Sequence, residues 1–214
     1  ENDPEIELNI LFRNYLLDND VSRNEYEKLK YQLVKNKSSH LKKDGAIYRE
    51  YTLEKGDFIH EILRRTEFNR LRMIICTNRT EWEKVKYFRE KYFFGPYGVE
   101  DPDSWTFDHK EHTHLVLYEG VDIIGYAHIQ FWNDKRAAIR IIIIDEEKRS
   151  KDLGSTFLSL IEKWLKMQDI KSIHAEPGQS SLNFYLKNGY SKISFDDPES
   201  YESDSKDIAV CKIL

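Results

Sequence analysis

The chain has 214 residues, of which 40% are hydrophobic and 33% are charged, a composition typical of a folded protein rather than a disordered one. The net charge of −5 gives no basic surface for nucleic acid, so we expect no nucleic-acid partner. No apolar run approaches the length of a membrane span, and Cys76 and Cys211 lie too far apart in sequence to suggest a disulfide framework. We therefore expect a cytoplasmic protein without a membrane partner.

The first part of the chain is predicted to be helical over residues 5–68, because its apolar residues recur at helical spacing. Ser22, followed three residues later by Glu25, has the form of a capping box and predicts the start of a second helix. Thr52 is the expected cap of a third helix.

From Leu71 onward the pattern changes to short strands separated by helices and turns. Thr80 is the expected cap of a helix over 81–92, and the residues 93–112, rich in Gly, Pro and aromatics, are expected to form an ordered loop. Strands are predicted at 71–77, 114–118, 122–132, 139–144, 172–176 and 208–214. Hairpins followed by helical crossovers predict an α+β fold with a mixed, mostly antiparallel sheet flanked by helices.

The most informative stretch runs from Ile139 to Leu165. Branched apolar residues predict a buried strand at its start, a charged turn follows, and a helix is expected from Leu153 or Gly154. The N-terminus of a helix presents unpaired N–H groups and a partial positive charge, which suit a phosphate.

The turn from Arg149 to Ser155 resembles the pyrophosphate loop of the GCN5-related N-acetyltransferases (GNAT), whose pattern is Gln/Arg-x-x-Gly-x-Gly/Ala. Arg149 and Gly154 match this pattern, whereas Asp152 stands where the first glycine usually is. A second segment, residues 183–190 (NFYLKNGY), resembles the family's FYxxxGF motif at the usual distance. Residues 71–214 are thus identified as a GNAT-type acetyltransferase domain.

The resemblance implies transfer of an acetyl group from acetyl-CoA, the cosubstrate, to a primary amine of a small molecule or peptide. It assigns the pantetheine and carbonyl contacts to backbone groups of the strand, and the pyrophosphate to the turn. The coenzyme-binding candidates are therefore Ile142, Ile143, Ile144, Arg149, Ser150, Lys151, Asp152, Leu153, Gly154 and Ser155. The apolar strand residues fit an ordinary protein core equally well.

Tyr185 occupies the position of the family's tyrosine, which protonates the leaving thiolate. The family often places a glutamate on the central strand as general base, but Arg140 and Ile141 stand there. The candidates for the base are His128 and Glu176, which stands at the end of a strand, with a relay through water as the alternative. By period-two alternation His128 shares a strand face with Tyr126, Gln130 and Trp132, a polar and aromatic face suited to a pocket. We expect no metal, because the His-x-His spacing near residue 112 lacks further ligands.

A noncatalytic acyl-CoA-binding or interaction module is the alternative function, supported by Asp152 in the turn and by the missing strand glutamate. Asp152 is alternatively a plain helix N-cap. The oligomeric state is left open, with a homodimer as one option.

The N-terminal helices have their own resemblance, carried by residues 12–16, 26–30 and 48–63. They resemble the C-terminal helical part of GrpB-like proteins, which have a nucleotidyltransferase-like fold. The carboxylate-bearing strands that phosphoryl transfer needs are not among these residues, so no such chemistry is expected here. The predicted domains are a helical GrpB-like segment over 1–70 and the GNAT domain over 71–214.

Overall fold

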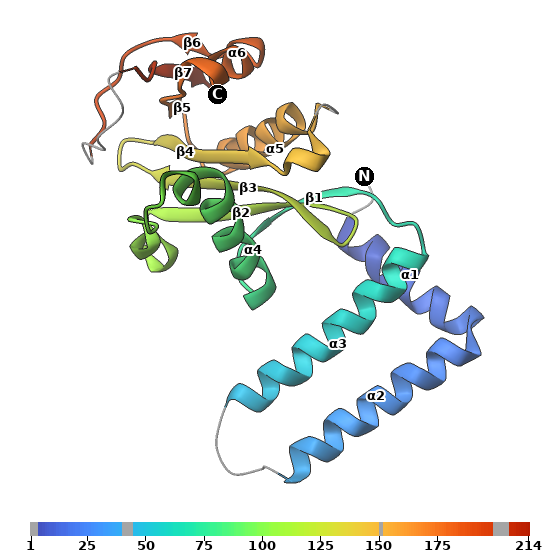
Figure 1. The fold of residues 1–214 in the computed structure, drawn as a ribbon. Helices are drawn as coiled ribbons and strands as arrows, with labels where there is room; N and C mark the ends of the chain where they lie inside the picture. Colours follow the sequence, from blue (N-terminus) through green and yellow to red (C-terminus); the bar gives the residue numbers. More distant parts are fainter. Residues whose placement is uncertain (1–3, 40–44, 150–151, 199–205) are drawn as a thin grey trace. The chain divides into compact units, whose positions relative to one another are not determined.

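The computed structural model describes residues 4–39, 45–149, 152–198 and 206–214 (Figure 1). The chain divides into two compact units, which are residues 1–72 with 119–122, and residues 73–118 with 123–214.

The first unit is helical, as the sequence predicts. Its helices are α1 (Pro4–Asp18), α2 (Asp20–Ser39) and α3 (Gly45–Arg65) (Figure 1). The ring of Tyr26 on α2 lies between two rings, with centroid distances of 5.3 Å to Phe12 on α1 and 5.4 Å to Phe58 on α3. Aromatic contacts between all three helices therefore hold this unit together.

The predicted caps of α2 and α3 are wrong. α2 begins at Asp20, and the side chain of Asn19 accepts a hydrogen bond from the backbone N–H of Ser22 at 3.0 Å. Ser22 therefore lies inside the first helical turn. Thr52 lies within α3, which already begins at Gly45. In α2 the capping pattern fails because an earlier Asn takes the same role, as its short polar side chain allows.

Seven strands form one sheet in the order β1-β2-β3-β4-β5-β7-β6. Their bounds are β1 Leu71–Ile75, β2 His112–Glu119, β3 Asp122–Phe131, β4 Arg136–Ile144, β5 Ser172–Ala175, β6 Ser191–Lys192 and β7 Val210–Ile213. β4 pairs with β5 in parallel, while β3 with β4, β5 with β7, and β6 with β7 pair antiparallel. The prediction of a mixed, mostly antiparallel sheet is confirmed.

Among the described residues, three helices flank this sheet: α4 (Arg79–Arg89), α5 (Leu153–Met167) and α6 (Gln179–Lys187). Single turns of π-helix (Glu90–Phe94) and 3₁₀-helix (Gly95–Tyr97, Ser104–Asp108 and Glu146–Lys148) occupy parts of the connections. α4 and α5 lie on opposite sides of the central strands (Figure 1). Under α4 the core includes Val85 and Phe88, packed with Tyr126 and Ile141 from the sheet.

The start of α4 also differs from the prediction, because Asn78 and not Thr80 is its cap. The Asn78 side chain accepts from the Glu81 N–H at 3.0 Å, and the Glu81 carboxylate accepts from the Asn78 N–H at 3.1 Å. This capping box fixes both groups at the first turn.

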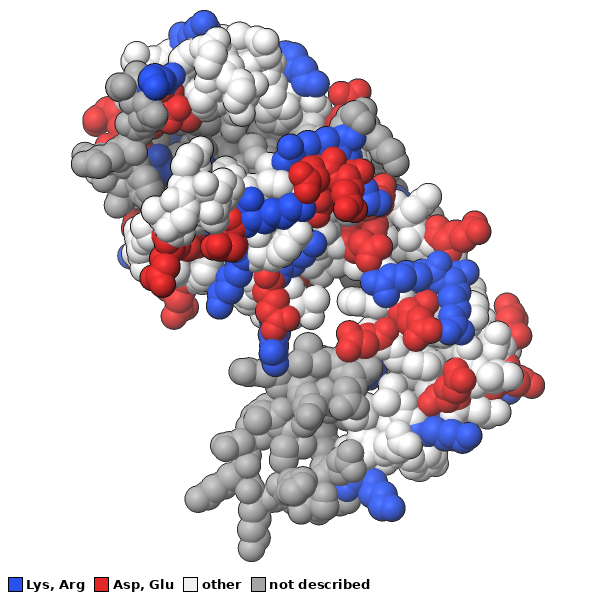
Figure 2. All heavy atoms as spheres, in the orientation of Figure 1, with Lys and Arg blue, Asp and Glu red and all other residues white. Residues whose placement is uncertain are grey.

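The surface carries both signs of charge. Figure 2 shows acidic and basic side chains mixed over the face that it draws. Within the described part of the chain, no helix is both long enough and apolar enough to cross a membrane.

Candidate functional site

The candidate site begins with an interruption in the pairing of β4. On one side, the register passes from His128↔Ile141 to Ile129↔Ile139, so Arg140 is an extra residue that forms a β-bulge. On the other side, the parallel ladder with β5 ends at Ala138↔His174 among the described residues. The remainder of β4, residues 139–144, makes no recorded pair with β5 in the described part of the chain, and these residues line a cavity.

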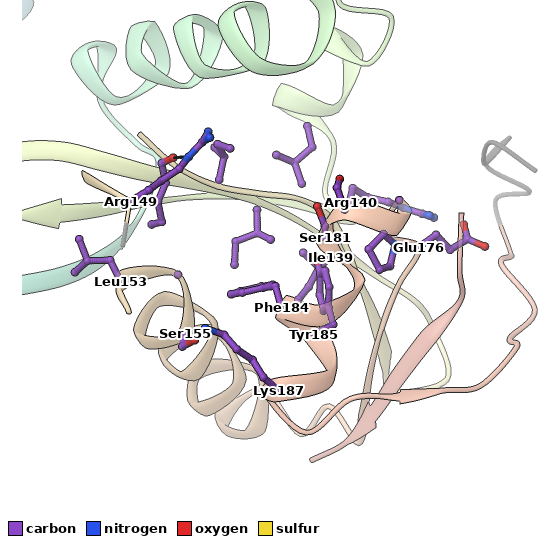
Figure 3. A pocket seen from close by; sticks show the side chains of 18 of the residues that line it. Ile139, Arg140, Arg149, Leu153, Ser155, Glu176, Ser181, Phe184, Tyr185 and Lys187 are labelled. Atoms are coloured by element: carbon purple, nitrogen blue, oxygen red, sulfur yellow. Dashed lines mark hydrogen bonds between the residues drawn. The ribbon is translucent and has the colours of Figure 1, made fainter. Parts of the chain in front are cut away.

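The cavity has a volume of about 750 Å³, within the usual range for ligand sites. It is bordered by β4, by the start of α5, and by α6 with the residues before it. Its lining residues are Phe93, Ile139, Arg140, Ile141, Ile142, Ile143, Ile144, Arg149, Asp152, Leu153, Gly154, Ser155, Glu176, Pro177, Gly178, Ser180, Ser181, Phe184, Tyr185 and Lys187. Figure 3 shows Arg149, Leu153 and Ser155 toward one end, and Arg140 and Glu176 toward the other.

At the first end, the turn before α5 brings a cation and the helix N-terminus together. The Arg149 guanidinium donates from Nε to the Ile144 carbonyl at 3.0 Å and lies 5.2 Å from the centre of the Tyr92 ring. The first N–H groups of α5, from Leu153 onward, have no partner within the helix and are therefore available for an anion. The candidates Ser150 and Lys151 lie outside the described residues.

Asp152 occupies the N-cap position of α5, but its side chain makes no capping hydrogen bond. Its backbone is left-handed, with φ of 53° and ψ of 14°, a conformation that glycine adopts most easily and that Asp tolerates. The side chain is 86% exposed, and its carboxylate lies 3.5 Å from the Lys187 ammonium at the end of α6. The interpretation of Asp152 as the helix N-cap therefore holds for its position but not for its side chain, and its backbone takes a conformation suited to the family's glycine.

Gly154 allows α5 to approach α6 closely. A Cβ atom at this position would lie 3.1 Å from the edge of the Phe184 ring, closer than nearly all such contacts. The absence of a side chain keeps the helix start against Phe184 and leaves the cavity open beside it.

Tyr185 lines the middle of the cavity from α6, where Figure 3 shows it beside Phe184 and Ile139. Its side chain is buried, and its ring contacts those of Phe184 and Tyr190 edge to face at 5.2 Å each. Burial raises the pKa of the Tyr185 hydroxyl, because the charged phenolate loses its hydration there. The group is therefore a neutral hydrogen-bond donor at physiological pH.

The second end of the cavity carries a charged group from β4 and another from the residue that follows β5. Arg140 donates from Nε to the Gln130 side chain at 2.7 Å and pairs with Asp197 at 2.6 Å. Glu176, just after β5, lines the same end of the cavity. A carboxylate is thus present at the cavity although the glutamate usual on the family's central strand is missing.

His128, the other candidate base, is not among the residues that line this cavity. It is 1% exposed, and its Nε2 lies 2.8 Å from Nδ1 of His112. Burial, reinforced by the charges of His114 and Arg89, holds the pKa of His128 well below 6.5. A histidine so weakly basic and so enclosed is a poor general base. The strand face that it shares with Tyr126 and Gln130 is protein core, and the expectation of a pocket on that face is wrong.

Comparison with known proteins identifies the family. Residues 80–190, just over half of the chain, match the acetyltransferase (GNAT) family. The chain belongs to the GNAT family. Residues 1–65 match the GrpB protein family, in agreement with the resemblance found in the helical segment. No curated protein matches the chain.

Solved structures agree with this GNAT assignment at the level of the fold. A GNAT acetyltransferase from Staphylococcus aureus Mu50 is 17% identical, with a TM-score of 0.56 over 68% of this chain and 99% of its own. Tetrahymena GCN5 is 13% identical, with a TM-score of 0.55 over 66% of this chain and 95% of its own. The PaiA N-acetyltransferase of Thermoplasma acidophilum, solved with coenzyme A, is 16% identical, with a TM-score of 0.51 over 68% and 99%. The GNAT family and fold support acyl transfer in general and the binding of a coenzyme A-type cosubstrate.

Several residues at this GNAT site were not singled out from the sequence. Lys187 and Phe184 lie within the NFYLKNGY motif, so the motif itself could have drawn attention to them. Phe93 lines the cavity from the π-helical turn, which no pattern in the sequence predicted.

Proposed function

We propose that this chain transfers an acetyl group from acetyl-CoA to a primary amine of a small molecule or peptide. The observation that carries this proposal is a cavity along the part of β4 that does not pair with β5, which joins Arg149 and the α5 N-terminus to Tyr185 and Glu176.

The residues present are suited to the coenzyme. Arg149, Lys187 and the first N–H groups of α5 supply positive charge and donors for the diphosphate. The apolar side chains of β4 and Phe184 suit the pantetheine arm, and backbone N–H groups at Ile142–Ile144 suit its carbonyl groups. Acetyl-CoA supplies an activated thioester when it is bound.

The chain's own groups would then move two protons. Glu176 accepts a proton from the acceptor ammonium, directly or through water, so that the nitrogen becomes nucleophilic. Tyr185 donates its proton to the departing thiolate, because its hydroxyl stays neutral at physiological pH. The two walls of the cavity align the reactants, which by itself lowers the barrier by several kcal/mol (up to about 7–11).

The noncatalytic alternative loses much of its support. It rested on Asp152 in the turn and on the missing strand glutamate. Asp152 has a left-handed backbone and an exposed side chain, and Glu176 provides a carboxylate at the cavity. We therefore favour the enzyme.

The test has two stages. Calorimetry with acetyl-CoA should show binding that weakens about tenfold on Arg149→Ala, since a charged hydrogen-bonding group is lost. Arg79→Ala, which removes an exposed arginine that pairs with Glu83 on α4, is the control and should bind normally. Thiol release measured over a panel of amines then tests catalysis. Binding without thiol release for any amine would favour the noncatalytic module.

A further inference from the structure

The π-helical turn Glu90–Phe94 at the end of α4 contributes Phe93 to the cavity and brings a second residue, Tyr92, against Arg149. Its closing hydrogen bond runs from the Gly95 N–H to the Glu90 carbonyl. A Cβ atom at residue 95 would lie 2.6 Å from that carbonyl oxygen, so the turn requires glycine there. Such turns occur frequently at functional sites, which raises the question of what this one positions.

The turn places Tyr92 against the segment that connects β4 to α5. The Tyr92 hydroxyl donates to the Asp145 carboxylate at 3.0 Å and accepts from the Glu146 N–H at 3.0 Å. Asp145 directly follows β4, and Glu146 begins the 3₁₀ turn that leads to Arg149. One hydroxyl therefore fixes two consecutive residues just before the coenzyme-binding turn.

The ring of Tyr92 also contacts Arg149 directly. The guanidinium lies 5.2 Å from the ring centre, within the range of a cation–π interaction. Its Nε is fixed separately by the Ile144 carbonyl at 3.0 Å. Contacts with a ring and a carbonyl restrict the orientation of the guanidinium.

The nearby acidic groups already have other partners. Lys91 lies 2.6 Å from Glu146 and 3.9 Å from Asp145, and Lys84 lies 3.8 Å from Asp145. Within the described ranges, no carboxylate pairs with Arg149. Arg149 therefore lines the cavity with its charge uncompensated by an acidic side chain, in the state that suits an incoming anion.

We propose that Tyr92 is a positioning residue for coenzyme binding, which orients Arg149 through its ring and fixes the turn through its hydroxyl. The proposal rests on the proposed function, in which Arg149 binds the diphosphate. Tyr92 contributes no group to the reacting atoms. It acts on the affinity for acetyl-CoA and not on the acceptor end of the cavity.

The experiment separates the two contacts. Tyr92→Leu removes ring and hydroxyl and should raise both Kd and KM for acetyl-CoA about tenfold, while kcat stays within about twofold. Tyr92→Phe keeps the ring and should raise Kd and KM only about two- to threefold, so it should partly restore the binding that Tyr92→Leu loses. Tyr87→Phe, on the exposed side of α4, is the matched control and should equal the wild type.

A double-mutant cycle with Arg149→Ala distinguishes positioning from general stability. If Tyr92 acts through Arg149, then Tyr92→Leu should weaken binding no further in the Arg149→Ala background. If the two substitutions raise Kd independently, so that their fold-changes multiply in the double variant, the proposal is overturned. Unchanged affinity in Tyr92→Leu would also overturn it. If Tyr92→Leu does not fold, the cycle with Tyr92→Phe tests the hydroxyl contacts: the two- to threefold loss should disappear in the Arg149→Ala background, and a loss that persists there would overturn the proposal.

The failure of this proposal is distinguishable from that of the proposed function. A wild-type chain that does not bind acetyl-CoA contradicts both. A wild-type chain that binds, with Arg149→Ala weakened and the Tyr92 variants unaffected, contradicts only the role of Tyr92.

Discussion

Tyr185 is buried among aromatic rings, and that environment suits both packing and proton donation. Tyr185→Phe separates the two roles, because it keeps the ring and removes only the hydroxyl. We predict that turnover falls about a hundredfold or more, while Kd for acetyl-CoA changes less than about twofold, since the proton is needed only as the reaction proceeds. Steady-state kinetics and calorimetry measure the two quantities.

The neighbouring tyrosine provides the control for this prediction. Tyr190 is buried, and its ring centroid lies 5.2 Å from that of Tyr185, but it does not line the cavity. Tyr190→Phe should therefore retain nearly full turnover. If both variants lose turnover equally, or if Tyr185→Phe keeps turnover within about twofold of the wild type, then Tyr185 only packs in the core and does not donate a proton.

Glu176 is the carboxylate best placed to act as the base, because it lines the cavity and His128 does not. Glu176→Gln keeps the size of the side chain and removes its basicity. We predict a loss of about a hundredfold in kcat at neutral pH, partly recovered at higher pH, where more of the free amine is present. Glu83→Gln, exposed on α4, is the control. A kcat that stays within about threefold of the wild type would favour the relay through water.

At the level of elements, the junction of β4 and α5 concentrates the departures from regular structure. A bulge at Arg140, the separation of β4 from β5, and a left-handed residue at Asp152 occur within a short stretch. Residues of all three features line one cavity. Irregular pairing therefore exposes the groups that a bound thioester and a diphosphate would use.

Asp152→Gly tests the departure from the family pattern. The left-handed backbone favours glycine, by roughly 1 kcal/mol, whereas the loss of a negative charge near the helix start costs about 0.3–1 kcal/mol. We therefore predict a melting temperature close to that of the wild type. Acetyl-CoA should bind two- to fivefold more tightly, because Lys187 is released from Asp152 and repulsion of the diphosphate is removed.

Asp152→Asn is the matched variant, because it removes the charge and still tolerates a left-handed backbone. If the effect on affinity is electrostatic, this variant should also bind more tightly, and the gain should shrink as salt rises. Weaker binding in both variants would mean that the Asp152 carboxylate shapes the turn.

At the level of the whole molecule, the sequence was sufficient for the class of fold and the family. Period-two and helical patterns in 71–214, together with two motifs, led to the mixed sheet of a GNAT protein. These signals are local in the sequence, so they can be detected without knowledge of the tertiary structure.

The sequence did not show which strand face would be open. Alternation correctly grouped Tyr126, His128 and Gln130, all of which are buried. Whether such a face is a pocket or a core depends on what covers it, here α4 and parts of the predicted loop. The π-helical turn was missed for a similar reason. It differs from an α-helical turn by one extra residue, and only the structure shows how closely Gly95 approaches the Glu90 carbonyl. Such features follow from packing and not from periodicity.

The covered face contains a cluster of buried histidines with consequences for stability. His112 Nδ1 lies 2.8 Å from His128 Nε2, and the ring of His114 stacks on that of His128 at 4.5 Å. His114 Nδ1 also lies 2.8 Å from the Tyr126 hydroxyl, which Arg89 contacts at 3.1 Å. Asp101 in turn pairs with Arg89, so the network joins three histidines, a tyrosine and an ion pair.

The pKa values of these histidines are lowered in the folded chain. Burial lowers the pKa of His112 and of His114 to about 4, and that of His128 well below 6.5. Above about pH 6.5 the histidines are neutral in both states, and their contribution to stability is fully present. As the pH falls from 6.5 toward 4, the unfolded chain binds protons that the folded chain does not, so stability must fall.

We predict that the free energy of unfolding decreases between about pH 7 and about pH 5, by roughly 1–2 kcal/mol for each of His112 and His114, with a further loss from His128. Urea unfolding at a series of pH values measures this slope. The measurements stay above pH 5, where the protonation of carboxylates contributes little to the change in stability. His112→Gln should lower stability at pH 7, because a buried hydrogen bond changes. It should reduce the further loss toward pH 5 by roughly a quarter, because burial also lowers the pKa of His174, outside the cluster, to about 4. A wild-type stability that does not change over this range, or an unaltered slope in the variant, would show that the cluster is not the group that titrates.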